Sequence, residues 1–134
     1  MGKFEEISHT ADVGIKVEGE SLEDLFQTAA KGMFSLITDL DKVQPQITKE
    51  IVVEGEDLED LLVRWLNELL YLHFQGMVFK DFRIKKLERK FLQAEAKGEK
   101  ISPSHSLNLE IKAATYHGLQ IQKDPPRTTI IFDV

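Results

Sequence analysis

The 134-residue sequence contains no cysteine. It therefore cannot build a disulfide framework, a thiolate zinc site, an iron–sulfur cluster or a cysteine nucleophile. Long apolar runs are also lacking, because no stretch approaches the ~20 residues that a membrane-spanning helix requires. The beginning of the chain, residues 1–6, has no apolar stretch of the kind found in a signal peptide. These absences predict a cytoplasmic protein with no membrane association.

Short catalytic motifs are missing as well. The sequence has no Gly-x-Ser-x-Gly, phosphate-binding loop, dinucleotide fingerprint or His-Glu-x-x-His. The histidines are scattered along the chain. His73 falls in a helical pattern and is interpreted as a packing residue, whereas His105 lies in a Pro/Ser loop without a readable role. The sequence therefore contains no nucleophile motif and no phosphate-binding motif that would indicate an enzyme.

Charge is unevenly distributed along the chain. The 17 basic and 23 acidic side chains give a net charge of −6. Residues 1–60 hold 5 basic and 15 acidic side chains, a net charge of −10, whereas residues 61–134 carry a net charge of +4. An acidic protein is a poor general binder of nucleic acid, because phosphate contacts need a cationic face. The asymmetry still permits a local basic patch, a divalent-cation site or docking onto a basic partner.

The clearest pattern is an internal duplication. Residues 51–62 repeat nine of the twelve residues of segment 15–26, at an offset of 36. Each copy has a β-branched run, a breaking glycine, and a helix cap (Ser21 or Asp57) followed three residues later by an aspartate. Two copies are too few for a solenoid, so they predict a duplicated strand–turn–helix unit inside one domain.

The spacing of apolar residues predicts the remaining elements. Amphipathic helices are expected over residues 22–37 and 58–72. From about residue 77 the period changes to two, which is typical of strands. The predicted strands are Val78–Phe79, Phe82–Lys85, Phe91–Ala96, Leu107–Ile111, Leu119–Gln122 and Thr129–Phe132, with a loop over Gly98–His105 and a turn at Asp124–Pro126. The expected architecture is α+β, with two helices packed on a mostly antiparallel sheet in a single domain, residues 1–134.

Carboxylates stand out at both ends of the chain. Asp12 lies between two strand-like segments, Asp133 follows an apolar run, and Val134 carries the α-carboxylate. Each has an ordinary interpretation, as a turn residue or as part of a solvated tail. If the three converge, they form an all-oxygen site, which favours calcium, magnesium or manganese over zinc or copper. Sequence spacing alone does not show that they converge.

Two groups of basic residues also admit more than one interpretation. Segment 80–90 holds six basic and two acidic residues and one aromatic residue, Phe82. It would either contact RNA phosphate or form the solvated face of a β-hairpin. Lys112 alternates with apolar neighbours and is expected to share a sheet face with Glu110 and Ala114.

Together, His9–Gly14 (HTADVG), Lys112–His117 (KAATYH) and the final Phe132–Val134 (FDV) resemble the archease family, and the similarity covers essentially the whole chain. The resemblance implies an accessory protein of the cytoplasm and not an enzyme. Its implied partner is the RtcB-type RNA-splicing ligase, which joins tRNA exon halves. Its implied role is to promote guanylylation of the ligase's active-site histidine and multiple turnover.

The same resemblance implies a set of functional residues. By motif match, a divalent metal, calcium before magnesium or manganese, is bound by Asp12, Asp133 and the main-chain oxygen of Val134. Lys112 and His9 would contact the partner or a nucleotide, and tRNA would be met only indirectly or weakly. The alternative is a chaperone or interaction module for tRNA-modifying enzymes such as a tRNA methyltransferase. A stand-alone metal-dependent hydrolase is a further alternative.

Overall fold

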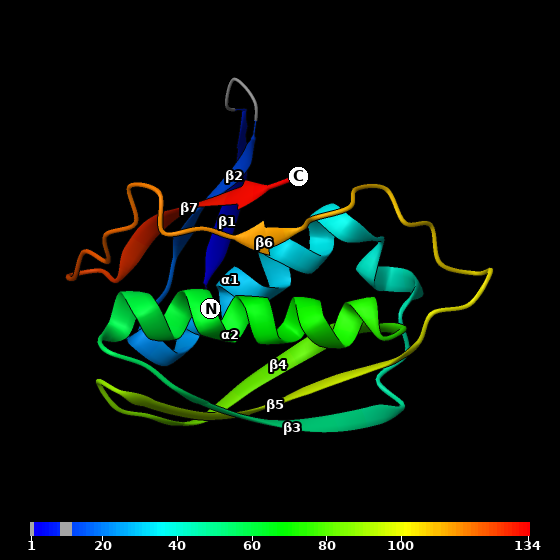
Figure 1. The fold of residues 1–134 in the computed structure, drawn as a ribbon, viewed down its shortest axis with the longest axis horizontal. Coiled ribbons are helices and arrows are strands. Elements are labelled where there is room, and N and C mark those ends of the chain that lie inside the picture. Colours follow the sequence, from blue (N-terminus) through cyan, green and yellow to red (C-terminus); the bar gives the residue numbers. More distant parts are fainter. Residues whose placement is uncertain (1, 9–11) are drawn as a thin grey trace.

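The computed structural model describes residues 2–8 and 12–134. Within these residues, two α-helices lie between two antiparallel sheets (Figure 1). The elements in chain order are β1 (Lys3–Ser8), β2 (Val13–Glu18), α1 (Leu22–Ile37), the 3-10 helix η1 (Leu40–Lys42), β3 (Ile47–Glu54), α2 (Leu58–Phe74), β4 (Met77–Leu87), β5 (Phe91–Lys100), β6 (Ala113–Ala114) and β7 (Arg127–Asp133). The first sheet has the order β1-β2-β7-β6 and the second the order β3-β5-β4. The predicted α+β class is confirmed, with two sheets in place of one.

The predicted duplication is visible at the start of each helix. The Ser21 hydroxyl accepts a hydrogen bond from the Asp24 N–H at 3.0 Å, and the Asp57 carboxylate accepts one from the Asp60 N–H at 2.8 Å. In return, the carboxylates of Asp24 and Asp60 accept a hydrogen bond from the N–H of the residue before each cap, at 2.8 Å in both copies. Both helices therefore begin where the capping pattern predicts, because the same orphan N–H groups are satisfied in the same way.

Strand pairing follows the duplication too. When 36 is added to the number of a β2 residue and subtracted from the number of its β7 partner, the two resulting residues are paired in the β3/β5 ladder. The pair Val13 and Phe132 thus corresponds to the pair Lys49 and Ala96. The hydrogen bonds that close the two units obey the same offset, since the N–H groups of residues 19 and 55 donate to the carbonyls of residues 126 and 90. The chain therefore contains two similar strand–helix scaffolds.

The core lies where both helices meet the inner faces of the sheets. Trp65 on α2 is fully buried and its indole N–H donates to the Phe26 carbonyl of α1 at 3.0 Å. Phe34 meets Phe79 edge to face, with ring centroids 5.6 Å apart. Burial of large aromatic side chains supplies much of the stabilisation, and their packing fixes the helices relative to the sheets. In the described part of the chain, neither helix is long and apolar enough to cross a membrane.

The strand predicted at Leu107–Ile111 is wrong. Residues 101–112, here called the crossing segment, form no strand and lead from the second sheet to the first. The Asn108 N–H donates to the Ile37 carbonyl at the end of α1, at 2.8 Å, and not to a neighbouring strand. Because β6 begins only at Ala113, Lys112 shares no strand face with Glu110. The alternation of apolar residues reflects a segment that runs along the surface.

The strand predicted at Leu119–Gln122 is also wrong, apart from a single bridge between Gln122 and Arg127. Two of its main-chain groups bond to side chains: the Ile121 N–H donates to the Glu59 carboxylate at 3.1 Å, and the Gln120 carbonyl accepts from the Thr128 hydroxyl at 2.9 Å. The loop predicted from Gly98 starts too early, since β5 continues to Lys100. The turn at residues 124–126 is confirmed.

Candidate functional site

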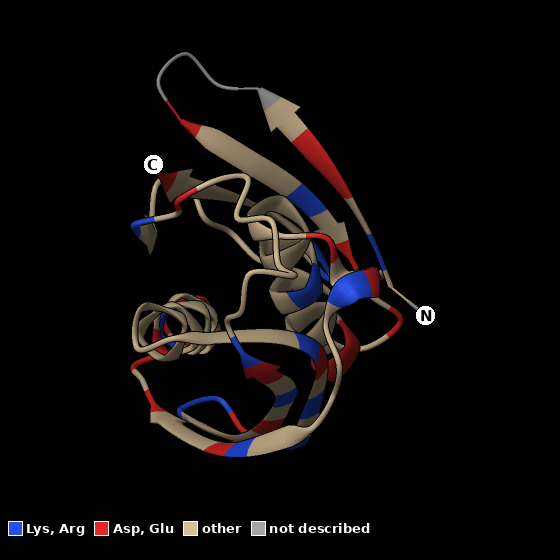
Figure 2. Ribbon diagram, turned by 90° about the vertical axis from the view of Figure 1, so that its right-hand side faces the viewer, with Lys and Arg blue, Asp and Glu red and all other residues tan. Residues whose placement is uncertain are grey.

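Asp12 lies directly before β2, and Asp133 is the last residue of the neighbouring strand β7. The β2/β7 ladder ends at the pair Val13 and Phe132. Asp12 directly precedes that pair and Asp133 directly follows it, so both lie at the same end of the two strands. In Figure 2 this end carries acidic ribbon both beside the grey segment and at the C-terminus. Opposite residues on antiparallel strands have Cα atoms about 4.5–5.5 Å apart, so we expect the residues that adjoin the Val13 and Phe132 pair to lie near each other.

Lys112 reaches the same end through its main chain. Its N–H donates to the Asp133 carbonyl at 2.8 Å, and the next residue, Ala113, pairs with Asp133 in the β6/β7 ladder. The Lys112 side chain is exposed. Asp12, Lys112, Asp133 and Val134 are here called the tip. His9 lies outside the described residues.

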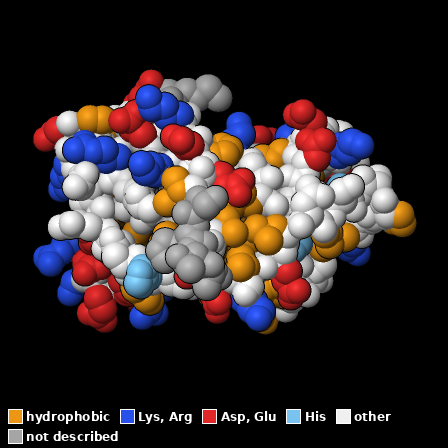
Figure 3. Space-filling view, turned by 90° about the horizontal axis from the view of Figure 1, so that it is seen from above, with side chains coloured by type: hydrophobic (Ala, Val, Ile, Leu, Met, Phe, Trp, Pro, Cys, Tyr) orange, Lys and Arg blue, Asp and Glu red, His pale blue; other side chains and the backbone are white. Residues whose placement is uncertain are grey.

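The tip side chains differ in their surroundings. Asp133 is exposed, and its carboxylate makes no hydrogen bond or ion pair with a described residue. Val134 is half-buried and packs against the core. Seen from above, hydrophobic side chains gather in the middle of the upper face with acidic side chains near them (Figure 3). Over residues 2–8 and 12–134, no three His, Asp or Glu side chains form a metal-binding cluster, so main-chain oxygens and water would have to complete a shell around two carboxylates.

The second scaffold offers an internal comparison for the tip. By the offset of the duplication, Asp12 and Asp133 correspond to Thr48 and Lys97, which pair directly in the β3/β5 ladder. One scaffold therefore has two carboxylates at this position, whereas the other has a hydroxyl and an ammonium group. Carboxylates on adjacent strands repel each other unless a cation lies near them. The corresponding pair of the second copy includes a cationic side chain, Lys97, in place of a second carboxylate.

Asn67 fixes the strand that leads into the tip. Its carboxamide oxygen accepts a hydrogen bond from the Ala114 N–H at 2.8 Å, and its nitrogen donates to the Ala114 carbonyl at 3.2 Å. Sequence reasoning missed this residue, because a single asparagine in a helical segment is indistinguishable in sequence from an ordinary solvated residue.

Asp60 holds the same stretch of chain two residues further on. The Tyr116 hydroxyl donates to one Asp60 oxygen at 2.6 Å, and the Arg64 guanidinium donates to the other at 2.9 Å. The Tyr116 hydrogen bond is the main cause that lowers the Asp60 pKa below its ordinary value, and Arg64 lowers it further. The same bond raises the Tyr116 pKa. Charged hydrogen bonds of this kind are stronger than neutral ones, so they help to hold residues 113–121 against α2.

The structure gives His105 a role that its sequence context did not suggest, and it confirms His73 as a packing residue. The His105 ring is buried, its Nδ1 accepts from the Ser102 N–H at 3.0 Å, and its Nε2 donates to the Glu99 carboxylate at 2.9 Å. Glu99 also accepts from the Gln44 N–H at 2.8 Å, which with His105 lowers the Glu99 pKa. This network fixes the start of the crossing segment. His73 bonds to the Met77 carbonyl through Nδ1 and packs on Phe34.

Three of the six basic residues of segment 80–90 pair with carboxylates, namely Arg83, Lys85 and Lys86. The Lys85 ammonium lies 2.9 Å from Glu50 and 3.4 Å from Glu95, and its pKa is raised chiefly by the Glu50 hydrogen bond. Arg83 also pairs with Glu95, at 3.9 Å. These cross-strand pairs favour the interpretation as the solvated face of a hairpin over an RNA-binding stretch.

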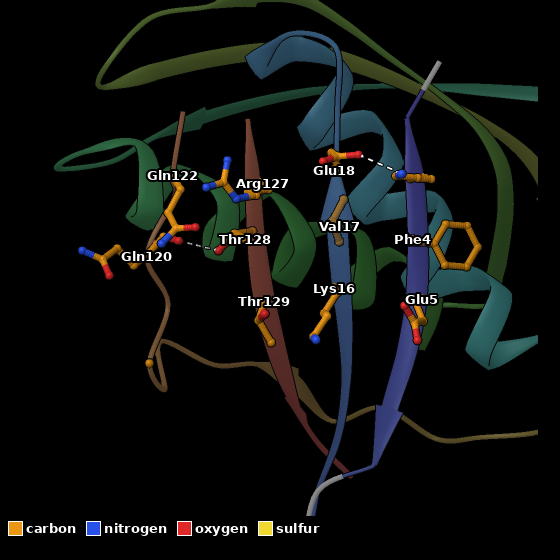
Figure 4. A pocket seen from close by; sticks show the side chains of 12 residues that line it. Phe4, Glu5, Lys16, Val17, Glu18, Gln120, Gln122, Arg127, Thr128 and Thr129 are labelled. Carbon is orange, nitrogen blue, oxygen red and sulfur yellow. Dashed lines mark hydrogen bonds and ion pairs between the residues drawn. The ribbon is translucent and has the colours of Figure 1, made fainter. Parts of the chain in front are cut away.

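A groove of about 510 Å³ lies on the β1-β2-β7 side of the first sheet (Figure 4). Three of its charged side chains are already engaged, since Lys3 pairs with Glu18 at 3.1 Å and the Arg127 guanidinium donates to the Pro125 carbonyl at 3.0 Å. None of the predicted site residues lines it. The groove is therefore separate from the tip, and nothing in it points to chemistry.

These features define a small α+β protein in which a duplicated strand–turn–helix unit carries an acidic tip on one copy only. Comparison with known proteins gives the family. Residues 4–134 match the model of the archease protein family. An archease of Pyrococcus abyssi is 45% identical over 130 residues, which covers 93% of this chain and 92% of the relative. An archease of Methanopyrus kandleri is 42% identical, with 92% of each chain covered. The chain belongs to the archease family.

Solved structures agree with this assignment. The solution structure of protein 1598 of Methanobacterium thermoautotrophicum has a TM-score of 0.80 at 31% identity, covering 98% of each chain. A crystal structure from Thermotoga maritima, described as an archease and possible chaperone, has a TM-score of 0.64 at 25% identity, with 96% of this chain and 94% of that chain covered.

Proposed function

We propose that the protein is an accessory protein that activates an RtcB-type RNA-splicing ligase. It promotes guanylylation of the ligase and repeated turnover in the joining of tRNA exons, and it is not itself an enzyme. The observation that supports this most is the β2/β7 register. Its last pair is Val13 and Phe132, and Asp12 and Asp133 are the next residues at that end of the two strands. That is the end at which Lys112 is hydrogen-bonded to Asp133.

The donor set of the tip fits a hard divalent cation. Asp12 and Asp133 provide carboxylate oxygens and Val134 a main-chain oxygen, which favours calcium, with magnesium or manganese as alternatives. The Asp133 carboxylate has no other partner among the described residues. The ammonium group of Lys97 at the equivalent position supports a requirement for positive charge. When bound, such an ion would neutralise part of the charge of nucleotide phosphates.

The exposed side chain of Lys112 is available to a partner. The exposed Lys112 is expected to contact a nucleotide phosphate or a carboxylate of the ligase, and His9 is expected to contribute to the same contact. The net charge of −6 argues against direct binding of tRNA. The site of action is the cytoplasm, where the ligase and its substrates would meet the protein.

A guanylylation assay tests the proposal. Ligase and GTP are incubated with and without the protein across a metal titration, and the adduct is quantified. Asp12→Asn and Asp133→Asn keep side-chain shape but remove charge, and we expect each to reduce stimulation by roughly tenfold or more. Glu110→Gln, an exposed residue of the crossing segment, serves as the control. The melting temperature of the Asp133→Asn variant should not fall, because removing one of two like charges relieves repulsion. Full stimulation by both variants would contradict the proposal.

The second candidate is a chaperone for tRNA-modifying enzymes such as a tRNA methyltransferase. It is favoured by the description of the Thermotoga maritima relative as a possible chaperone. Light scattering by a heated methyltransferase, with and without the protein, measures this activity. Suppression of aggregation that survives both chelation and Asp133→Asn would favour the chaperone over the activator.

A further inference from the structure

The strand that borders the tip cannot hold its position by pairing alone. β6 consists of Ala113 and Ala114 only and is the last strand of the first sheet. It pairs with β7 on one side. On the other side, the N–H and carbonyl of Ala114 both bond to the carboxamide of Asn67. A helix side chain thus satisfies the edge of the sheet in the way a further strand would.

The hydrogen bonds on the β7 side carry this constraint to the tip. The Lys112 N–H donates to the Asp133 carbonyl at 2.8 Å, and the Thr115 N–H donates to the Ile131 carbonyl at 3.0 Å. Ala114, the residue held by Asn67, lies between these two donors. Displacement of β6 would therefore stretch both bonds and move Lys112 away from Asp133.

Asn67 is well placed to impose a fixed position. It lies on α2 between fully buried neighbours, with Trp65 and Leu66 before it and Leu69 after it. The backbone of a packed helix moves little, so a side chain on it keeps a well-defined position. We propose that Asn67 is a positioning residue, which sets Lys112 against Asp133 and thereby shapes the tip. The consequence for cation binding and ligase activation rests on the proposed function, whereas the positioning itself does not.

The chemistry of the two bonds permits a sharp variant. Ala114 offers one donor and one acceptor, and a carboxamide is the complement of both. Asn67→Asp keeps the size but presents two acceptors when ionised, so a negative oxygen faces the Ala114 carbonyl. Protonation of that carboxyl restores an O–H donor, and its pKa should lie above the ordinary value of about 3.9 because the facing carbonyl disfavours the charged form. The defect of the N67D variant should therefore disappear in acid.

Amide hydrogen exchange of the metal-free protein tests the positioning. At pH 7 we expect the protection factors of the Lys112 and Thr115 amides to fall at least tenfold in the N67D variant, while β2/β7 amides keep theirs. At pH 4 the variant should recover the protection seen in the wild type at that pH, which corrects for other titrating groups. Tyr116→Phe, which removes a different anchor from the same stretch, should leave the Lys112 amide protected. Unchanged Lys112 protection at pH 7, or no recovery at pH 4, would overturn the inference.

Calcium titration of the same proteins links the positioning to the tip. We expect roughly tenfold weaker binding in the N67D variant, and unchanged binding in Tyr116→Phe even where the two variants lose similar stability. Equal affinity of the N67D variant and the wild type would overturn the link between Asn67 and the tip. A wild-type protein that binds no divalent cation would instead refute the proposed function, and the exchange experiment would still decide the role of Asn67.

Discussion

At the residue scale, a few polar side chains of α2 do what regular strand pairing does elsewhere. Asn67 holds Ala114, Asp60 holds Tyr116, and Glu59 binds the N–H of residue 121. Each bond joins the helix to a stretch that has almost no ladder of its own. Because an unmade hydrogen bond of a buried group costs about 1–3 kcal/mol, each of these contacts matters for the local position of the chain.

The Tyr116–Asp60 bond has a measurable pH signature. Tyr116→Phe should lower the free energy of unfolding by about 1 kcal/mol at pH 7. The Asp60 pKa is depressed in the folded protein, so the stabilisation is present above the unfolded pKa near 3.9 and disappears as the pH falls through the folded pKa. The difference between wild type and variant should therefore shrink in acid. It should also shrink in strong base, because the raised Tyr116 pKa gives stabilisation that is lost as the pH rises through it.

Urea unfolding from pH 3 to pH 11 checks this prediction. The phenylalanine ring occupies nearly the same space as the tyrosine ring. If the difference in free energy of unfolding between wild type and variant stayed constant over the whole pH range, it could not come from the Tyr116–Asp60 hydrogen bond, and the hydrogen-bond account would be contradicted.

At the element scale, the contact between β4 and β5 depends on one glycine. Gly98 pairs with Phe79 on β4, next to a register shift between Phe79 and Asp81. A Cβ at Gly98 would lie 2.7 Å from the Phe79 Cα and would overlap the Val78 carbonyl. Since both obstacles are main chain, no side-chain rotation relieves them. Gly98→Ala should therefore destabilise the protein by about 3 kcal/mol, as measured by chemical denaturation, and a loss below about 0.5 kcal/mol would contradict this packing.

The elements that could be predicted from the sequence are those fixed locally. Both helices begin at Ser21 and Asp57 as expected, because capping involves neighbours in the chain. The strands predicted at 107–111 and 119–122 were wrong, because the main-chain groups there bond to Ile37 and Glu59, far away in the sequence. Apolar alternation carries no information about such partners.

The tip was only partly predictable. Asp12 and Asp133 could be named from the family resemblance, but their proximity depends on the β2/β7 register, which no local pattern encodes. Asn67 had no sequence signal at all, since its role requires β6 to lie beside α2.

At the scale of the whole molecule, the protein is one scaffold used twice with different ends. The shared offset of 36 relates the pairings of β2 with β7 and of β3 with β5. Only the first copy ends in two carboxylates, and the protein as a whole carries a net charge of −6. Binding of a cation at the tip would relieve local repulsion and would raise the stability of the folded state by mass action.

Calorimetric titration of calcium into the purified protein tests the central claim most directly, with Asp12→Asn, Asp133→Asn and, as the control at the equivalent position of the second copy, Lys97→Gln. We predict saturable binding at a single site in the wild type and in Lys97→Gln, and loss of binding in each aspartate variant. Binding that survives both aspartate substitutions, or no binding of calcium, magnesium or manganese by the wild type, would contradict the account.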